Sequence, residues 1–233
     1  MTLSNLKDQV LSANLRIVSA GLAKLTWGNV SGCDPDSGCV VIKPSGVPYH
    51  QLRDDDLVVL NLEGRVLEGS LRPSSDTPTH LALYRAFPGI RGICHTHSPF
   101  ATAFAQAAVE LPCFGTTHAD HFFGPVPVCR VLTPEEAGQD YEGITGAVIV
   151  ECFRSRGIDP AAVPAVLQRY HAPFAWGLSP QEAVDNSIAL EMCAQMALAS
   201  LQLRPDLEPL PTHLLQKHYL RKHGPGAYYG QNH

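Results

Sequence analysis

The chain has 233 residues, of which 45% are hydrophobic and 17% are charged, and its formal net charge at pH 7 is −5. This composition is typical of a globular protein, and the acidic balance argues against a nucleic-acid-binding surface. The seven cysteines are scattered without a Cys-x-x-Cys pair, and neither a signal peptide nor a long apolar run is present, so we expect a cytoplasmic protein without a disulfide framework or membrane segment.

The first third of the chain predicts one helix and a strand-rich stretch. Residues 3–20 carry apolar side chains at helical spacing and end at Gly21, which predicts a helix. Apolar runs at 38–42 and 56–60 predict strands, and the polar stretch from 61 to 69 indicates a hairpin. The polar stretch around residues 27–31 is interpreted as a turn.

The middle of the chain alternates helix and strand signals. Proline at the first helical position predicts helices over 77–87 and from Ser98 onward. An apolar strand from Gly92 delivers a His-x-His pair between them. The segment 147–156 is ambiguous, because Val-Ile-Val suits a strand, whereas the following Gly157 would cap a helix.

The last third is mainly helical. Capping boxes at 133–136 and 179–182 predict two helices, the second reaching about Leu201. Residues 165–170 predict a strand that leads to a histidine, and a final helix is expected over 212–223. No repeat or linker divides the chain, so residues 1–233 are expected to form a single domain, a mixed sheet covered by helices.

The pair His95 and His97 is the first metal signal. On a strand, residues i and i+2 point to the same face, so both imidazoles could reach one metal ion. Imidazole is a ligand for zinc, copper, iron and nickel. The alternative is that one or both are ordinary surface or core histidines.

Two further residues extend this signal. His171 follows the predicted strand 165–170, so three histidines at two strand ends could cap a metal and leave positions open for substrate. Asp76 is a plausible carboxylate ligand. Its alternative is strong, because an aspartate beside a Thr-Pro helix start is commonly a capping residue.

Three small-residue turns could bind an anion: residues 27–31, Lys43-Pro44-Ser45-Gly46, and Ser74-Ser75 before a helix N-terminus. Taken singly, each is more often just a turn. Together with the histidines they suggest a small phosphorylated substrate.

Two polar segments remain. Asp120, in the stretch 116–121, could move protons near a metal, although a solvated loop is the alternative. The C-terminal stretch from His218 to Gln231 is rich in basic and aromatic groups. Such a terminus is often frayed, but it could dock over a site in its own subunit or a neighbouring one.

Together these motifs resemble the class II aldolase family, nearly from end to end of the chain. The matching segments are residues 25–31, 42–47, 73–80, 95–98, 115–120, 173–177 and 217–231. The segment 116–120 and the tail point more narrowly to the sugar-phosphate epimerases of that family.

The resemblance implies an α/β fold, a three-layer α/β/α sandwich around a mixed, mostly antiparallel sheet, assembled as a homotetramer with active sites between subunits. It implies a divalent metal, most often zinc, with manganese or cobalt as alternatives. The implied ligands are Asp76, His95, His97 and His171. The substrate, mainly its phosphate, would be bound by Gly28, Asn29, Lys43, Ser45, Gly46, Ser74 and Ser75. Asp120 and Tyr229 would be the two proton donors and acceptors, with Tyr229 arriving from an adjacent subunit.

One position departs from the family pattern. A glycine is expected after the third metal histidine, whereas this chain has Ala172. The added methyl group would crowd the site slightly beside His171.

The implied reaction is epimerisation at carbon 4, interconverting L-ribulose 5-phosphate and D-xylulose 5-phosphate in pentose catabolism. Carbon 4 carries no acidic proton, so the bond between carbons 3 and 4 would be broken and remade, with the metal as a Lewis acid and a proton-transfer group on either side. A related aldolase would release the aldehyde instead. A non-catalytic assembly module of the same fold is a third interpretation, but it predicts lost ligands, and all four candidates are present here.

Overall fold

A single sheet organises the molecule. The computed structural model describes residues 2–228, and in this part of the chain a seven-stranded sheet has the order β4-β3-β2-β1-β5-β7-β6. The strands are β1 (Asn29–Asp34), β2 (Cys39–Ile42), β3 (Val58–Asn61), β4 (Val66–Glu68), β5 (Gly92–His95), β6 (Ala165–Leu167) and β7 (Pro173–Gly177). Neighbouring strands all pair antiparallel, and a parallel pairing occurs at the isolated bridge between Val128 and Leu167.

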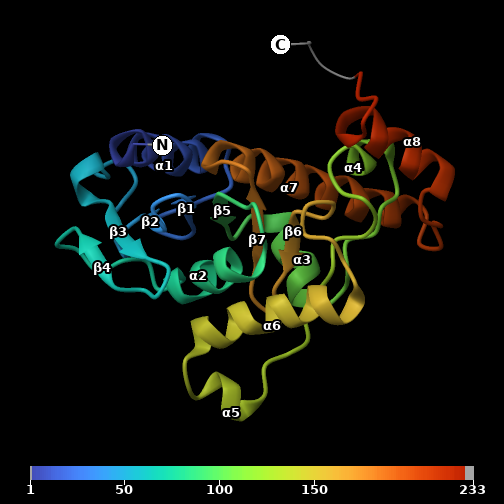
Figure 1. Ribbon diagram of the computed structural model, residues 1–233. Helices are drawn as coiled ribbons and strands as arrows, with labels where there is room; N and C mark the ends of the chain where they lie inside the picture. The colour runs from blue at the N-terminus through green and yellow to red at the C-terminus, as the bar shows by residue number, and fades with distance from the viewer. Residues whose placement is uncertain (1, 229–233) are drawn as a thin grey trace.

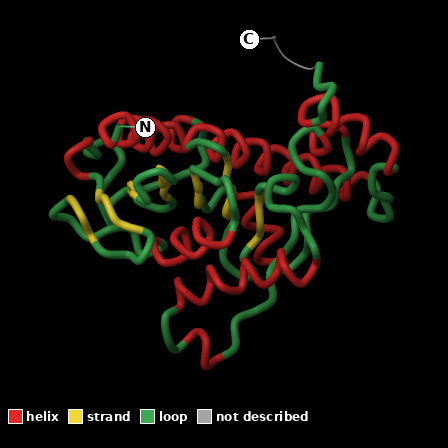
Figure 2. The backbone as a smooth tube through the Cα atoms, in the orientation of Figure 1, coloured by secondary structure: helices red, strands yellow, loops and turns green. Residues whose placement is uncertain are grey.

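Helices cover both faces of this sheet, as Figures 1 and 2 show. The helices α1 and α7 run along the upper face in Figure 1, and α2 and α6 lie below it. The helical elements are α1 (Leu3–Ser19), the 3-10 turn η1 (Asp54–Asp56), α2 (Thr77–Ala86), α3 (Pro99–Ala107), α4 (Thr116–Ala119), α5 (Pro134–Ala137), α6 (Tyr141–Arg156), α7 (Pro180–Leu203) and α8 (Thr212–His223). This arrangement confirms the predicted three-layer sandwich with a mostly antiparallel sheet.

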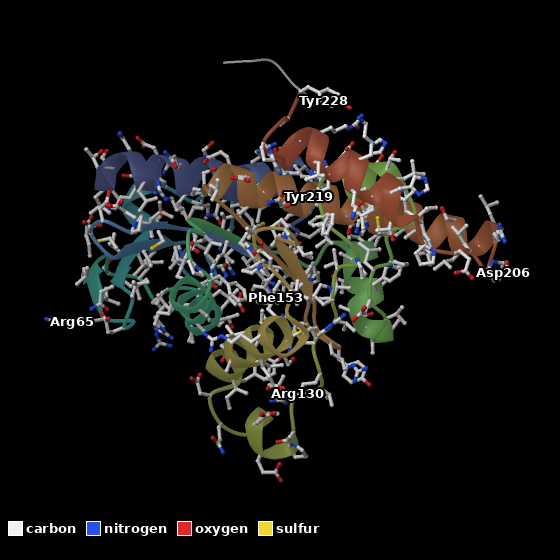
Figure 3. The ribbon with its side chains drawn as sticks, turned by 45° about the vertical axis from the view of Figure 1, so that its right-hand side comes forward. Arg65, Arg130, Phe153, Asp206, Tyr219 and Tyr228 are labelled. Atoms are coloured by element: carbon white, nitrogen blue, oxygen red, sulfur yellow. The ribbon has the colours of Figure 1, made fainter. Side chains whose placement is uncertain are left out.

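Alternation along the strands divides the core into two layers. Val41 and Cys94 belong to the cluster that packs under α1 and α7, whereas their neighbours Val40 and Ile93 belong to the cluster on the opposite face. Successive residues of a strand point to opposite faces, which accounts for the division. Phe153 of α6 lies in the second layer and is 1% exposed (Figure 3).

The first helix shows how the sequence builds one layer and positions a strand. Its buried residues recur at helical spacing, as Leu6, Val10, Ala13 and Ile17. The buried amide of Asn14 donates from Nδ2 to the Val30 carbonyl at 2.9 Å and accepts from the Val30 N–H at 2.9 Å. This pair of bonds fixes the start of β1 against α1.

A glycine lets the long helix α7 sit on the sheet. A Cβ atom added to Gly92 would lie 2.2 Å from the carbonyl oxygen of Ser179, the residue that caps α7. Real Cβ atoms do not approach backbone so closely, so β5 must begin without a side chain. The start of α7 can therefore cross directly over the strand that carries His95.

Several boundaries differ from the sequence predictions. The stretch 147–156 is helical, since α6 ends where Gly157 takes the left-handed conformation with φ 61°. The prediction of a turn over 27–31 was wrong from Asn29 onward, because β1 begins there. The strand predicted over 165–170 ends at Leu167, and β7 was not predicted. At the predicted 179–182 capping box, Ser179 accepts from the Glu182 N–H, but the Glu182 carboxylate bonds to the Leu178 N–H instead.

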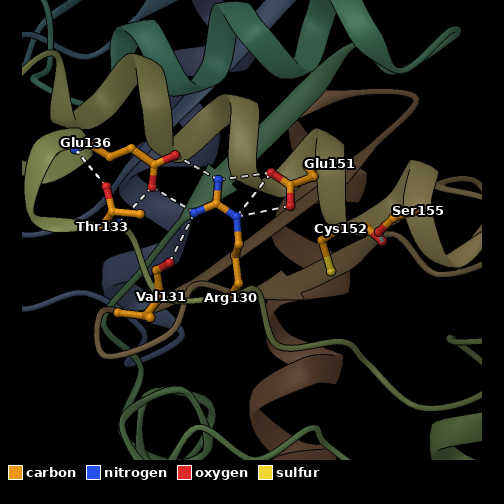
Figure 4. A network of polar contacts seen from close by, with 7 residues as sticks. All are labelled: Arg130, Val131, Thr133, Glu136, Glu151, Cys152 and Ser155. Carbon is orange, nitrogen blue, oxygen red and sulfur yellow. Dashed lines mark hydrogen bonds and ion pairs between the residues drawn. The ribbon is translucent and has the colours of Figure 1, made fainter.

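An arginine braces the segment between α4 and α6, which carries α5 at the bottom of Figure 1. The Arg130 guanidinium binds both carboxylate oxygens of Glu136 at 2.7 and 2.8 Å, and Glu151 of α6 at 3.0 Å (Figure 4). The Glu136 carboxylate in turn accepts from the Thr133 N–H, which confirms the predicted capping box. This network ties α5 to α6.

Within residues 2–228, none of the helices has both the length and the apolar character needed to cross a bilayer.

Candidate active site

A polar cavity of about 340 Å³ opens where the ends of several elements meet. It is lined by the residues around the start of β1, the turn after β2, the start of α2, the ends of β5 and β6, and the start of α6. These are Thr26, Trp27, Gly28, Asn29, Lys43, Pro44, Ser45, Gly46, Ser74, Ser75, Asp76, His95, His97, Tyr141, Glu142 and His171. The predicted metal ligands and phosphate-binding residues therefore share one cavity.

Three histidines lie together in this cavity. One nitrogen from each of His95, His97 and His171 lies within 4.8 Å of the others, and the Nε2 atoms of His95 and His171 are 3.2 Å apart. His95 is the last residue of β5, so the prediction that both members of the His-x-His pair lie on a strand was wrong: His97 follows in the connection to α3. Their rings nevertheless converge, with centroids 5.0 Å apart.

The ring of His95 is held by its surroundings. Its Nδ1 atom is 2.9 Å from the carbonyl oxygen of Pro173, and Phe174 stacks on the ring at a centroid distance of 4.2 Å. If Nδ1 carries the proton and donates to that carbonyl, the unprotonated Nε2 is left to face the other two rings. A backbone carbonyl on the outer nitrogen is the usual way in which a metal-binding histidine is oriented.

The electrostatics of the cluster favour neutral imidazoles. Burial, together with the neighbouring histidines, lowers the pKa of His171 to about 4, and burial lowers the pKa of His97 as well. Neutral imidazole is the form that binds a metal. The donor set therefore fits a divalent transition metal, because three unprotonated nitrogens meet at a cavity with room for substrate.

Asp76 lies beside the cluster rather than within its three converging nitrogens. It occupies the position before α2, but its side chain makes no capping bond to that helix. Its Oδ2 atom accepts from Asn29 Nδ2 at 2.7 Å instead. Burial opposes ionisation, but nearby His95 and His80 and the Asn29 bond outweigh it and lower the pKa of the carboxyl. Asp76 is thus an anion at the edge of the cluster.

The opposite side of the cavity is rich in polar groups. The Lys43 side chain is 1% exposed, and its Nζ atom lies 3.2 Å from the Pro44 carbonyl and 4.8 Å from the centroid of the Tyr49 ring. Burial lowers the pKa of this ammonium to about 8. Asn29 donates to Ser74 Oγ at 3.0 Å, which joins two of the predicted substrate-binding segments.

Gly28 permits the close approach of two elements at the cavity. Its φ is +76°, and a Cβ atom there would lie 2.7 Å from the carbonyl oxygen of His95. Any other residue would be strained in this conformation and would press on the backbone of the histidine pair. Gly28 therefore lets the segment before β1 lie directly against His95.

Ala172 does not distort the site in the way that its methyl group suggested. It is fully buried, and it is absent from the described residues that line the cavity. Positive φ angles occur at Leu25, Ala108 and Tyr170 among the described non-glycine residues, so position 172 does not require the glycine conformation. His171 keeps its place in the cluster.

Asp120 lies elsewhere on this subunit. It follows the short helix α4, where a loop was one interpretation, and its carboxylate binds the Arg221 guanidinium of α8 at 2.6 and 2.9 Å and His218 Nδ1 at 3.2 Å. Burial raises the pKa of Asp120, but the hydrogen bond and charge of Arg221 outweigh it and lower the pKa overall. Asp120 is not among the described residues that line the cavity. Tyr229, the other predicted catalytic residue, lies outside the described residues.

Two cavity residues were missed by sequence reasoning. Tyr141 and Glu142 begin α6 and line the cavity. The only usable signal was Asp140 as a helix cap, and the helix itself was ambiguous in sequence. A buried network was also missed: Ser31 Oγ lies 2.7 Å from both His80 Nδ1 and Tyr84 Oη.

The geometry agrees with what comparisons with known proteins show. The family model described as Class II Aldolase and Adducin N-terminal domain matches residues 8–198. Proteins named L-ribulose-5-phosphate 4-epimerase UlaF from Salmonella paratyphi C and Salmonella typhi are 48% identical over 229 residues, which cover 98% of this chain and 100% of each relative.

Solved structures show the same fold. An L-fuculose 1-phosphate aldolase superposes with a TM-score of 0.78 at 24% identity, covering 94% of this chain and 96% of that one. An L-fuculose-1-phosphate aldolase from Thermus thermophilus gives a TM-score of 0.67 at 25% identity, covering 86% and 97% of the two chains. The chain therefore belongs to the class II aldolase and adducin N-terminal domain family, as its motifs predicted.

Proposed function

We propose that the chain is a metal-dependent epimerase that inverts carbon 4 and interconverts L-ribulose 5-phosphate and D-xylulose 5-phosphate. The observation that carries this proposal is that three converging imidazoles face a cluster of anion-binding groups within one cavity. Its near-complete alignment with proteins named as epimerases of this kind supports the choice of substrate.

The proposed metal site consists of His95, His97 and His171, with Asp76 as the fourth ligand and zinc, manganese or cobalt as the cation. When bound, such a cation supplies Lewis-acid chemistry for charge that develops on the substrate oxygens. Asp76 is ionised and adjacent, so its role in this site rests on its charge and its place beside the cluster. Asn29 would orient it through the 2.7 Å hydrogen bond.

The substrate phosphate would lie on the polar side of the cavity. We assign it to Gly28, Asn29, Lys43, Ser45, Gly46, Ser74 and Ser75, all of which line the same space. Phosphate oxygens are matched by the Lys43 ammonium, by hydroxyls and by backbone N–H groups at the start of α2. Holding the phosphate would keep the three-carbon and two-carbon fragments from separating while the bond between carbons 3 and 4 is open.

The proposed proton-transfer groups belong together on a second subunit. Asp120 is held by Arg221 of α8, and the backbone N–H of Tyr228, the last described residue, donates to the Arg221 carbonyl at 2.9 Å. Asp120 and the chain leading to Tyr229 are therefore delivered by one subunit, away from its own cavity. We infer that they complete the cavity of a neighbouring subunit in a cytoplasmic homotetramer of single-domain chains.

A coupled epimerase assay tests the proposal. The purified protein is treated with a chelator, restored with zinc, manganese or cobalt, and supplied with L-ribulose 5-phosphate. We expect D-xylulose 5-phosphate to form only after metal is restored. Accumulation of free glycolaldehyde phosphate would instead identify an aldolase, and the absence of both turnover and bound metal would identify a non-catalytic module.

The pH dependence of substrate affinity should report the ionisation of Lys43. Because burial lowers its pKa to about 8, the ammonium is charged below that pH and neutral above it. We expect KM to rise by up to about tenfold per pH unit above pH 8, with kcat little changed. In the Lys43→Met variant KM should be high throughout and lack this inflection. A wild-type KM that stays flat from about pH 6.5 to about pH 9.5 would contradict the assignment.

A further inference from the structure

Two thiols far from the metal cluster lie in contact with each other. Cys129 lies between α4 and α5, where its N–H donates to the Leu167 carbonyl of β6 at 2.9 Å. Cys152 projects from α6, and the two thiols are hydrogen-bonded. Cys152 Sγ also lies 4.0 Å from the carbonyl oxygen of Val128. Cys129 is 1% exposed and Cys152 is 8% exposed, so solvent has limited access to Cys152 alone.

The charges around the pair differ at its two ends. Arg156 lies one helical turn beyond Cys152 on the same face of α6, and its guanidinium donates to the Cys152 sulfur while it pairs with Glu110. Arg130 lies near Cys129, but its guanidinium is already bound to Glu136 and Glu151 (Figure 4). The cation that serves the pair is therefore placed at Cys152.

This asymmetry gives the two thiols different reactivities. The hydrogen bond from Cys129 and the charge of Arg156 lower the pKa of Cys152 despite its burial. The same thiol contact and burial raise the pKa of Cys129. A thiolate is the nucleophile in thiol chemistry, so Cys152 is the member that attacks and Cys129 is the member that resolves.

We propose that Cys129 and Cys152 form a redox-active dithiol, which hydrogen peroxide oxidises to a disulfide. The Cys152 thiolate attacks one peroxide oxygen, the O–O bond breaks, and a sulfenic acid and hydroxide result. The Cys129 sulfur then attacks the sulfenic sulfur, and its proton leaves with the displaced hydroxide as water. The two thiols thus lose two electrons, and one peroxide becomes two waters.

The position of the pair connects it to the cavity. The helix that carries Cys152 begins with Tyr141 and Glu142, which line the cavity, and Cys129 is bonded to the strand that precedes the His171 turn. A disulfide would draw the two sulfurs to about 2.05 Å, closer than any thiol hydrogen bond. Oxidation therefore shifts α6 relative to β6, two elements that both end at the cavity.

Mass spectrometry of the full-length protein tests the proposal without reference to activity. After peroxide treatment and alkylation of remaining thiols in denaturant, we expect a loss of about 2 Da and a Cys129–Cys152 cross-linked peptide, both reversed by dithiothreitol. In Cys129→Ala, dimedone should label Cys152 and no cross-link should form. In Cys152→Ala, both products should be absent.

Matched variants separate this chemistry from general oxidation. Cys113 and Cys193 are a second neighbouring pair, but burial raises the pKa of these thiols to about 11 and about 12, so Cys193→Ala should be oxidised like the wild type. Exposed Arg156 can be changed without disturbing the core, and Arg156→Gln should slow cross-linking at pH 7 severalfold, whereas Glu110→Gln should not slow it. Unmodified wild-type protein, a Cys113–Cys193 cross-link, or equal rates in Arg156→Gln and wild type would each overturn the proposal.

Discussion

Replacing His97 by asparagine is expected to remove most of the bound metal and to lower kcat/KM by at least about 100-fold. His97 contributes one of three nitrogens that lie within 4.8 Å of each other, and its ring is half-buried at the cavity. Asparagine is shorter and offers an amide in place of the imidazole nitrogen. Two histidines would remain, which is too few for a stable site of this type.

Metal content by elemental analysis and turnover in the same preparation would check this result. His50→Asn is the matched control, because His50 is exposed and lies outside the cavity. That variant should keep wild-type metal content and rate. High concentrations of added zinc should partly restore His97→Asn if affinity is what was lost. Full metal retention with normal turnover in His97→Asn would remove this residue from the site.

Replacing Asp120 by asparagine is expected to lower turnover by roughly 10²- to 10⁴-fold while the metal content stays at the wild-type value. The amide cannot accept a proton, although it occupies the same space. Tyr229→Phe should behave in the same way. Arg221→Lys distinguishes the two roles of Asp120, because lysine keeps the charge but loses the two-pronged contact that holds α8 against α4.

Mixing inactive variants tests where Asp120 acts. When His97→Asn and Asp120→Asn chains are unfolded together and reassembled in equal amounts, a site built from two subunits can combine an intact His97 with an intact Asp120. About a quarter of wild-type activity should return under random assembly. No recovery, with wild-type activity after the same treatment of wild-type chains, would place both groups within one subunit or exclude Asp120.

The sequence predicted most helices because their signals are local. Thr77-Pro78 and Thr133-Pro134 begin helices where proline and capping residues placed them. The strands β1 and β7 were not recognised, because β1 carries Asn29, Ser31 and Gly32, and β7 begins with Pro173 and ends with Gly177. Both are buried on every residue by neighbouring strands and helices, so tertiary contacts rather than alternating polarity make them strands.

The candidate site followed a similar division. The histidines and the anion-binding turns could be predicted from residue type, and the structure brings them into one cavity. Residue type carries no information about which nearby groups compete for a side chain. The Arg221 pairing of Asp120 was therefore unforeseen, as was the contact of Asp76 with Asn29 instead of with its own helix. Tyr141 reaches the cavity only because α6 begins there.

The strand order gives the site a place in the folding sequence of the chain. β1 to β4 are joined to one another by short connections, whereas β5 pairs with β1 on one side and with β7, some eighty residues later, on the other. The histidine cluster lies at this junction, so it exists only once the most distant pairings have closed. A cation that binds there cannot guide early folding, but it would lengthen the lifetime of the native state by slowing the opening of the junction.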